Sequence, residues 1–168
     1  MPTRTSRACR TRGGPKRPQP NLHHHVSRVL PYTPDQLFGL VGDVARYPEF
    51  VPWITSMRTW NARTLGEGVE SVDAEAGVGF SFLKERFATR VHRDAAARQI
   101  DVSLLSGPFR RLINRWQFLE DPAGTRIEFD IDFQFKSRLL DGLLKANFHH
   151  AVDRLMGCFE DRAKSLYG

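Results

Sequence analysis

The chain has 168 residues, 40% of them apolar and 11% aromatic, which is enough to build the core of one domain and excludes a disordered chain. No stretch reaches about 18 consecutive apolar residues, and Cys9 and Cys158 lie far apart without metal or redox spacing, which excludes an integral membrane protein, a disulfide scaffold and a zinc module. The net charge of +6 comes from residues 1–22, which hold six of the 25 basic residues and none of the 19 acidic ones. Residues 23–168 are therefore neutral, so DNA is not an expected partner.

Residues 1–22 are predicted to form a disordered basic extension, because they are rich in Pro and Gly and hold almost nothing apolar to bury. Because it contains arginines and no acidic residues, the segment faintly resembles an organelle transit peptide. Its prolines and glycines, however, oppose the amphipathic helix that such peptides form. We interpret the segment as a dispensable extension or a wrongly assigned start. The folded domain is predicted to cover residues 23–168.

A strand and a helix are predicted to open this domain. The strand covers His23–Pro31 and stops at the proline. The helix follows a capping box, with Thr33 as the cap, Pro34 in the first helical position and Gln36 three residues after the cap. Its apolar stripe ends near Val44.

From the end of this helix the pattern changes. A second short turn is predicted to end at Tyr47, because Pro48 pushes the preceding residue out of the helical region. Short alternating segments between Trp53 and Lys136 then predict an antiparallel meander. Turn residues predict hairpin tips at 66–68, 95–98 and 121–124. One segment, Gly79–Val91, keeps its alternation only if a bulge lies between residues 82 and 83.

The chain ends in a predicted long helix from Ser137 to Leu166. Its apolar residues recur at three- and four-residue steps, and include Leu140, Leu143, Leu144, Phe148 and Phe159. Only the apolar face of the meander can cover so long a stripe. The order of elements therefore predicts an α+β fold, in which a curved antiparallel sheet wraps around the C-terminal helix.

Motifs of the common enzyme classes are absent from the sequence, including the nucleophile elbow, the zinc-protease helix and the phosphate-binding loop. No catalytic residue is predicted. His23 and His25 would share one face of the first strand, but without a carboxylate nearby in sequence they are interpreted as an exposed edge rather than a metal site. The sequence is therefore expected to bind no metal and no catalytic cofactor.

An apolar hollow between sheet and helix is the expected ligand site, because Phe occurs at 12 positions and Trp at three. Core packing alone can also use these aromatic residues. Asn114 falls in phase with Leu112, Trp116 and Phe118, so its amide would point into the hollow and need a partner, for which a ligand carbonyl is one option. The alternative is a bulge that turns Asn114 toward solvent.

Five short motifs stand out along the chain: Tyr-Pro-Glu-Phe-Val-Pro-Trp at 47–53, Val-Gly-Phe at 78–80, Gly-Pro-Phe at 107–109, Trp-Gln-Phe at 116–118 and Phe-Gln-Phe-Lys-Ser at 133–137. Together they resemble the motifs of the coenzyme Q-binding protein family, a START-like helix-grip group that includes the bacterial ribosome association toxin. The resemblance covers about residues 23–166. It implies a helix-grip fold with short helices after the first strand, and a non-catalytic cavity protein.

The resemblance also implies a ligand, ubiquinone (coenzyme Q) or a similar lipid, and a role in respiratory electron transport. It assigns a mouth loop, a sheet side and a helix side to the cavity. The mouth loop is Phe50, Val51, Pro52 and Trp53, the sheet side is Phe80, Phe82, Phe109 and Trp116, and the helix side is Leu140, Leu144 and Phe148. Asn114 is added to the expected ligand-binding residues. The exposed aromatic loop would permit peripheral membrane contact.

Two alternatives to quinone binding stay open. The first is a protein of the ribosome association toxin type, which binds the ribosome and blocks subunit joining. The second is a polyketide cyclase-like enzyme, since related grip folds hold such chemistry. A cytoplasmic location is expected, with possible contact at the inner membrane, or a mitochondrial one if the source is eukaryotic.

Overall fold

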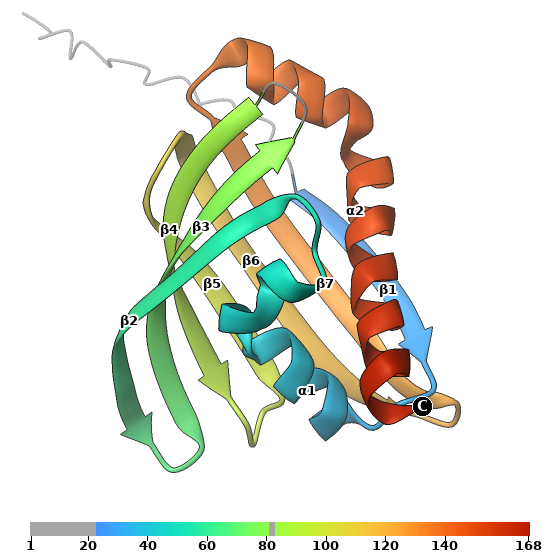
Figure 1. Cartoon of the computed structure of the whole chain (residues 1–168). Helices are drawn as coiled ribbons and strands as arrows, with labels where there is room; N and C mark the ends of the chain where they lie inside the picture. Colours follow the sequence, from blue (N-terminus) through green and yellow to red (C-terminus); the bar gives the residue numbers. More distant parts are fainter. Residues whose placement is uncertain (1–22, 81–82) are drawn as a thin grey trace, which may run out of the picture.

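The computed structural model describes residues 23–80 and 83–168, which form a curved antiparallel sheet around a long helix (Figure 1). The predicted extension, residues 1–22, and Phe82 lie outside the described residues. In chain order the elements are β1 (His23–Leu30), α1 (Pro34–Gly42), the 3₁₀ helix η1 (Val44–Glu49), β2 (Ile54–Gly66), β3 (Val69–Phe80), β4 (Leu83–Asp94), β5 (Gln99–Ser106), β6 (Phe109–Asp121), β7 (Gly124–Phe135) and α2 (Arg138–Tyr167). The strand order is β1-β7-β6-β5-β4-β3-β2.

The start of α1 confirms the predicted capping box. The Thr33 hydroxyl accepts a hydrogen bond from the Gln36 backbone N–H at 3.2 Å, and the Gln36 side chain accepts one from the Thr33 N–H at 3.0 Å. The predicted end of the following turn at Tyr47 is wrong, because η1 continues through Pro48 to Glu49. The Tyr47 carbonyl accepts hydrogen bonds from the N–H groups of residues 50 and 51, which hold the turn together beyond the proline.

The three predicted hairpin tips are confirmed, since β2–β3, β4–β5 and β6–β7 are joined at residues 67–68, 95–98 and 122–123. The predicted bulge within Gly79–Val91 is wrong. The segment instead belongs to two strands, because β3 ends at Phe80, β4 begins at Leu83 and these two residues are paired. Paired residues of a hairpin point to the same face of the sheet, whereas two residues three positions apart in one continuous strand point to opposite faces. A turn that pairs residue i with residue i+3 therefore shifts the alternation by one residue, as a bulge does.

The long helix α2 confirms the prediction for the C-terminal segment. Ser137 caps it by accepting a hydrogen bond from the Leu140 N–H, and Figure 1 shows that the helix bends between its first turns and the rest. Its buried face carries Phe148, Val152, Met156, Phe159 and Ala163. Leu143, expected on this stripe, is 45% exposed, because the first turns of α2 bury only part of their circumference.

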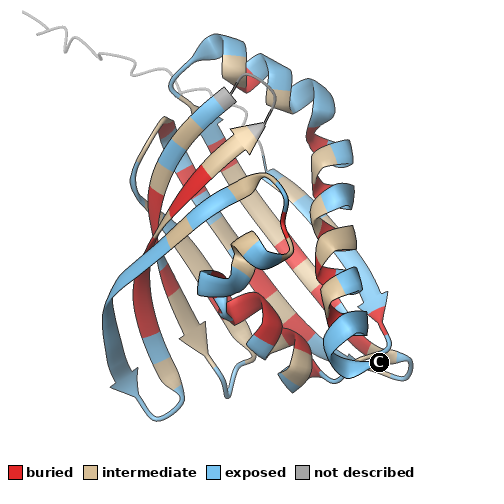
Figure 2. Cartoon of the chain, in the orientation of Figure 1, coloured by how far each residue is buried: buried red, intermediate tan, exposed pale blue. Residues whose placement is uncertain are grey.

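The core lies between the inner face of the sheet and the helices (Figure 2). On β7, Ile127, Phe129 and Phe133 are at most 3% exposed and alternate with acidic residues on the outer face, as predicted. The predicted α+β helix-grip fold is thereby confirmed. Among the described residues, no helix combines the length and apolarity needed to cross a membrane.

Candidate functional site between the sheet and the C-terminal helix

The inner face of the sheet has one half that is fully covered by helices. Here Trp116, Phe118, Ile127 and Phe129 are at most 5% exposed. Trp116 packs on Phe129 at 4.2 Å and on Phe159 of α2 at 5.5 Å between ring centroids. We call this region the covered half. Trp116, which the sequence placed among the cavity residues, is packed here as part of the core.

The other half of the inner face, which we call the open half, is incompletely covered. Five of its sheet residues are only half-buried: Val102, Leu104, Asn114, Ile131 and Phe135. Leu112, Phe133 and Phe109, which lie among them, are buried. Apolar side chains that keep exposed surface on a concave face are the usual lining of a site for a hydrophobic molecule. The open half is therefore the candidate functional site.

Asn114 is the polar group of the open half, and it points inward as its strand phase predicts. It pairs with Val102 of β5 and Ile131 of β7, both apolar. Its side-chain oxygen, Oδ1, is buried and has no hydrogen-bond partner among the described residues. A buried acceptor without a donor costs about 1–3 kcal/mol. A ligand hydroxyl or N–H can fill this role, whereas the ligand carbonyl considered from the sequence cannot pair with that oxygen.

The helix side of the site comes from the first turns of α2. The Asp141 carboxylate accepts a hydrogen bond from the Phe135 N–H at 3.2 Å, which fixes these turns to the end of β7. Leu140 and Leu144 are half-buried in these turns, and Phe148 is 4% exposed. All three predicted helix residues therefore lie on or beside the buried face of α2.

His24 is a site residue that the sequence analysis missed. Its ring stacks on Phe148 at 3.7 Å between centroids, and its Nε2 atom is buried without a partner among the described residues. Burial lowers the pKa of His24 below its ordinary value of 6.5, and the nearby His149 and His23 lower it further. The signal was present in the alternation of β1, which puts His24 on the same face as Val26.

The other two histidines of β1 point outward and meet carboxylates of β7, which the sequence did not reveal. His25 lies 2.8 Å from Asp130 and 2.7 Å from Glu128, and His23 lies 3.0 Å from Asp130. The hydrogen bond with Asp130 raises the pKa of His25 above 6.5. Within the described part of the chain, no three His, Cys, Asp or Glu side chains are arranged to hold a metal ion.

The predicted mouth loop bridges the sheet edge and α2. The Trp53 carbonyl accepts a hydrogen bond from the Gly79 N–H at 2.9 Å, and the Arg154 guanidinium lies over the Trp53 ring at 5.2 Å. Phe50 contacts Phe159 at 5.4 Å. Val51 is fully buried at 0% exposure, Phe50 and Trp53 are half-buried, and Pro52 is exposed.

The predicted sheet residues divide between the halves. Phe109 stacks on Phe135 at 4.5 Å at the end of the open half, away from Trp116 in the covered half. Phe80 ends β3 at the same end of the sheet, whereas Phe82 lies outside the described residues. The structure thus places Asn114 and Phe109 on the open half and Trp116 in the covered half.

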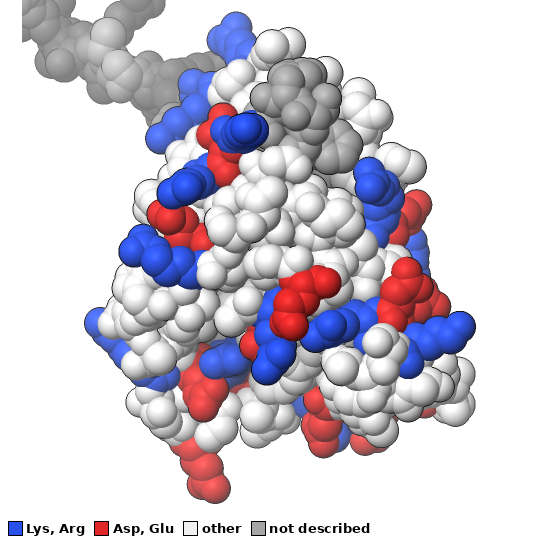
Figure 3. All heavy atoms as spheres, in the orientation of Figure 1, with Lys and Arg blue, Asp and Glu red and all other residues white. Residues whose placement is uncertain are grey.

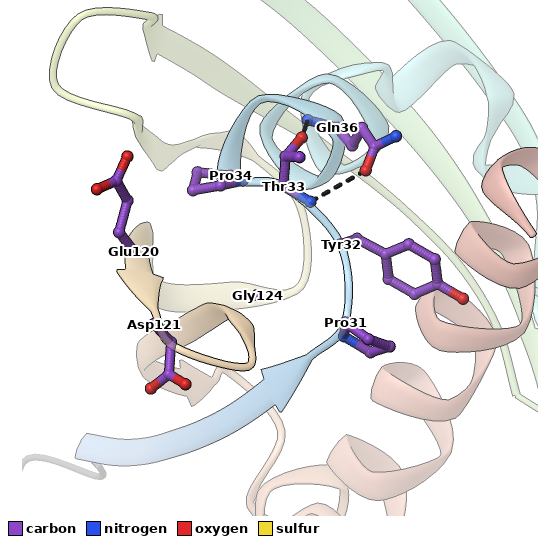
Figure 4. Close-up of a pocket in the computed structure, with 8 residues that line it drawn as sticks. All are labelled: Pro31, Tyr32, Thr33, Pro34, Gln36, Glu120, Asp121 and Gly124. Carbon is purple, nitrogen blue, oxygen red and sulfur yellow. Dashed lines mark hydrogen bonds between the residues drawn. The ribbon is translucent and has the colours of Figure 1, made fainter.

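Two cavities lie outside the open half. One, of about 350 Å³, lies between the loop that leads into α1 and the β6–β7 hairpin, and Figure 4 shows its capping-box hydrogen bonds and the Glu120 and Asp121 side chains. The other, also about 350 Å³, lies between α1 and the end of α2 and is bordered by Arg46 and Arg162. Neither was predicted, because both depend on packing between distant segments.

Comparisons with known proteins decide the family. The model of the polyketide cyclase/dehydrase and lipid transport family matches residues 30–160. The chain belongs to this family. The predicted START-like membership is thereby confirmed, while the family itself includes both cyclases and lipid transporters, so membership leaves catalysis open.

Individual relatives refine this placement within the family. The chain is 35% identical to the ribosome association toxin RatA of Rickettsia prowazekii, over 86% of this chain and 98% of that protein. It is 63% identical to the 18 kDa protein CC1736 of Caulobacter crescentus, whose solution structure matches with a TM-score of 0.75 over 87% of this chain and 98% of that one. The mitochondrial coenzyme Q-binding protein COQ10 homolog B of Xenopus laevis is 27% identical, over 88% of this chain and 60% of that protein.

Proposed function

We propose that this protein associates with the ribosome and blocks the joining of ribosomal subunits. The observation that carries the proposal is the match to the ribosome association toxin of Rickettsia prowazekii, which extends over 98% of that protein. The coenzyme Q-binding relative is more distant, at 27% identity, and this chain covers only 60% of it. The relatives therefore favour ribosome association over quinone binding, which the motifs alone had put first. The role is one of binding rather than catalysis, in the cytoplasm.

Co-sedimentation tests this proposal. The full chain is mixed with purified 30S and 50S subunits of Escherichia coli and separated on a sucrose gradient at two Mg²⁺ concentrations. We expect the protein in one subunit fraction, with fewer 70S particles as its concentration rises. Protein that stays at the top of the gradient, with an unchanged 70S peak, would overturn the proposal.

A second candidate function is the binding of a hydrophobic molecule with a hydroxyl or N–H group in the open half. The half-buried apolar face and the unpaired Asn114 oxygen favour it. A quinol offers such a donor, whereas the carbonyls of an oxidised quinone do not. Burying two isoprene units would contribute about 6–8 kcal/mol before association costs. A peripheral membrane contact would then serve ligand exchange.

Mass spectrometry of organic extracts tests this second candidate. Leu144→Glu places a charge on the half-buried helix side, and Leu139→Glu places the same charge at a position that is 71% exposed. We expect lipid in extracts of the wild type and of the Leu139 variant, and none from the folded Leu144 variant. Empty extracts from all three, with no uptake of added quinol, would rule out ligand binding.

A further inference from the structure

Five basic side chains at one end of the molecule are exposed. They are Lys84, Arg86, Arg110, Lys136 and Arg138. Within residues 23–80 and 83–168, none of the five takes part in a side-chain hydrogen bond or ion pair. The neighbouring arginines of the outer sheet face behave differently, since Arg111 pairs with Asp132 at 2.9 Å and Arg115 with Asp101 at 2.6 Å. We call the five unpaired residues the basic end.

The antiparallel topology explains why these residues meet. Lys84 and Arg86 lie at the start of β4, and Arg110 lies at the start of β6. Lys136 follows the end of β7, which is paired there with the start of β6, and Arg138 begins α2. Figure 3 shows blue side chains at the upper left of the molecule, with red ones beside some of them.

This end is positively charged although residues 23–168 are neutral overall. The segments 83–86, 107–111 and 136–145, together with Asp132, which pairs with Arg111, contain seven Lys or Arg residues and three Asp or Glu residues, so they carry a net charge of +4. Another of these acids, Asp141, pairs with Lys145 at 2.9 Å. The rest of residues 23–168 must then carry −4. The net charge of zero for residues 23–168 does not reveal this uneven distribution.

We propose that the basic end binds the phosphate backbone of ribosomal RNA; this inference rests on the proposed ribosome association. Unpaired cations on the ends of three strands and a helix form a broad surface, as a row of phosphates requires. Three of the five are arginines, whose guanidinium groups can hold a phosphate through two parallel hydrogen bonds.

The test compares two variants of the full chain that lose the same charge. In the first, Lys84, Arg86, Arg110 and Lys136 are each replaced with Gln. In the control, Arg46, Arg58, Arg63 and Lys164, which are exposed elsewhere, are each replaced with Gln. Far-UV circular dichroism and the Tm verify that both variants fold. Binding to Escherichia coli ribosomal subunits, to an RNA duplex and to phosphatidylglycerol vesicles is measured over a range of salt concentrations.

We expect the first variant to bind subunits and duplex at least about tenfold more weakly than the control, with a plot of log K against log salt flatter by about three. Equal losses in both variants, or no loss in the first, would overturn the proposal. Loss of vesicle binding with intact RNA binding would assign this end to a membrane instead. A wild type that binds duplex through these residues but not the ribosome would refute ribosome association and leave phosphate binding standing.

Discussion

The imidazole ring of His24 lies face to face with the phenyl ring of Phe148, with 3.7 Å between centroids and 23° between ring planes. The contact joins β1 to the middle of α2. Arg28, four residues further along β1, forms an ion pair with Asp153, five residues further along α2. The edge strand and the helix are therefore joined by ring contacts of His24 and by the ion pair of Arg28.

His24 should make the protein sensitive to acid. Its pKa is lowered in the folded state, so below about pH 6.5 the unfolded chain binds the proton first and stability falls as the pH decreases. His24→Phe keeps the stacked ring and removes this proton. The variant should lose less stability than the wild type between about pH 7.5 and about pH 5, measured by urea unfolding.

His25 should act in the opposite direction. Its pKa is raised in the folded state by Asp130, so its contribution is complete below about pH 6.5 and is lost as the pH rises through the folded value. His25→Gln should therefore destabilise the protein at acidic pH and have little effect at alkaline pH. For each variant, the difference in unfolding free energy from the wild type is plotted against pH. Differences that change in the same direction for the two variants would contradict the assignment.

Phe148 should contribute far more to stability than Leu143, although both belong to the apolar pattern of α2. Phe148 is 4% exposed and Leu143 is 45% exposed. Phe148→Ala should cost about 3–5 kcal/mol, and Leu143→Ala about 0.5 kcal/mol or less. Urea unfolding at neutral pH measures both values. Similar losses would mean that Leu143 is covered in solution.

Removing the unpaired acceptor of Asn114 should stabilise the protein. Asn114→Leu keeps the branching and the number of heavy atoms of the side chain and places an apolar group among Val102 and Ile131, so we expect a gain of about 1 kcal/mol in the free energy of unfolding. The same change should weaken uptake of a hydroxyl-bearing ligand. A loss of stability on substitution would show that the amide is satisfied by water.

Gly124 should tolerate no side chain, in contrast to Gly142. Gly124 has a φ of +133°, and a Cβ there would overlap the Leu30 carbonyl and approach the Pro31 Cα to 2.9 Å. Gly124→Ala should therefore cost more than about 1 kcal/mol. Gly142 lies in α2 with nothing within 4 Å of its Cβ position, so Gly142→Ala should stabilise by about 0.5–1 kcal/mol. Thermal unfolding distinguishes the two.

Most of the fold could be predicted from local sequence patterns. The capping box at Thr33, the turn residues of three hairpins and the stripe of α2 are each contained within a few consecutive turns or residues. The reversal after Phe80 could not be predicted, because its phase shift is the same as that of a bulge. The alternation of inward and outward residues in β6 does predict the inward direction of Asn114.

The candidate site was less predictable, because position along a strand decides whether an inward side chain is covered. Trp116 and Phe109 lie on the same strand, yet Trp116 lies under α2 near Phe159 and Phe109 lies at the end of the open half. The difference depends on where α1 and the bend of α2 lie, which is a matter of contacts between distant segments. The pairing of His25 with Asp130, 105 residues away, is hidden from sequence for the same reason.

The pairing of β1 with β7 also governs when the chain can fold. During synthesis β1 emerges early, but its strand partner, residues 125–132, follows about a hundred residues later. At about 5–20 residues per second, its hydrogen-bonding edge waits roughly 5–20 s for that partner. The pairing of β1 with β7 is therefore a late and slow step of folding. Variants that weaken β1 should first show a low yield of folded protein in cells rather than altered binding.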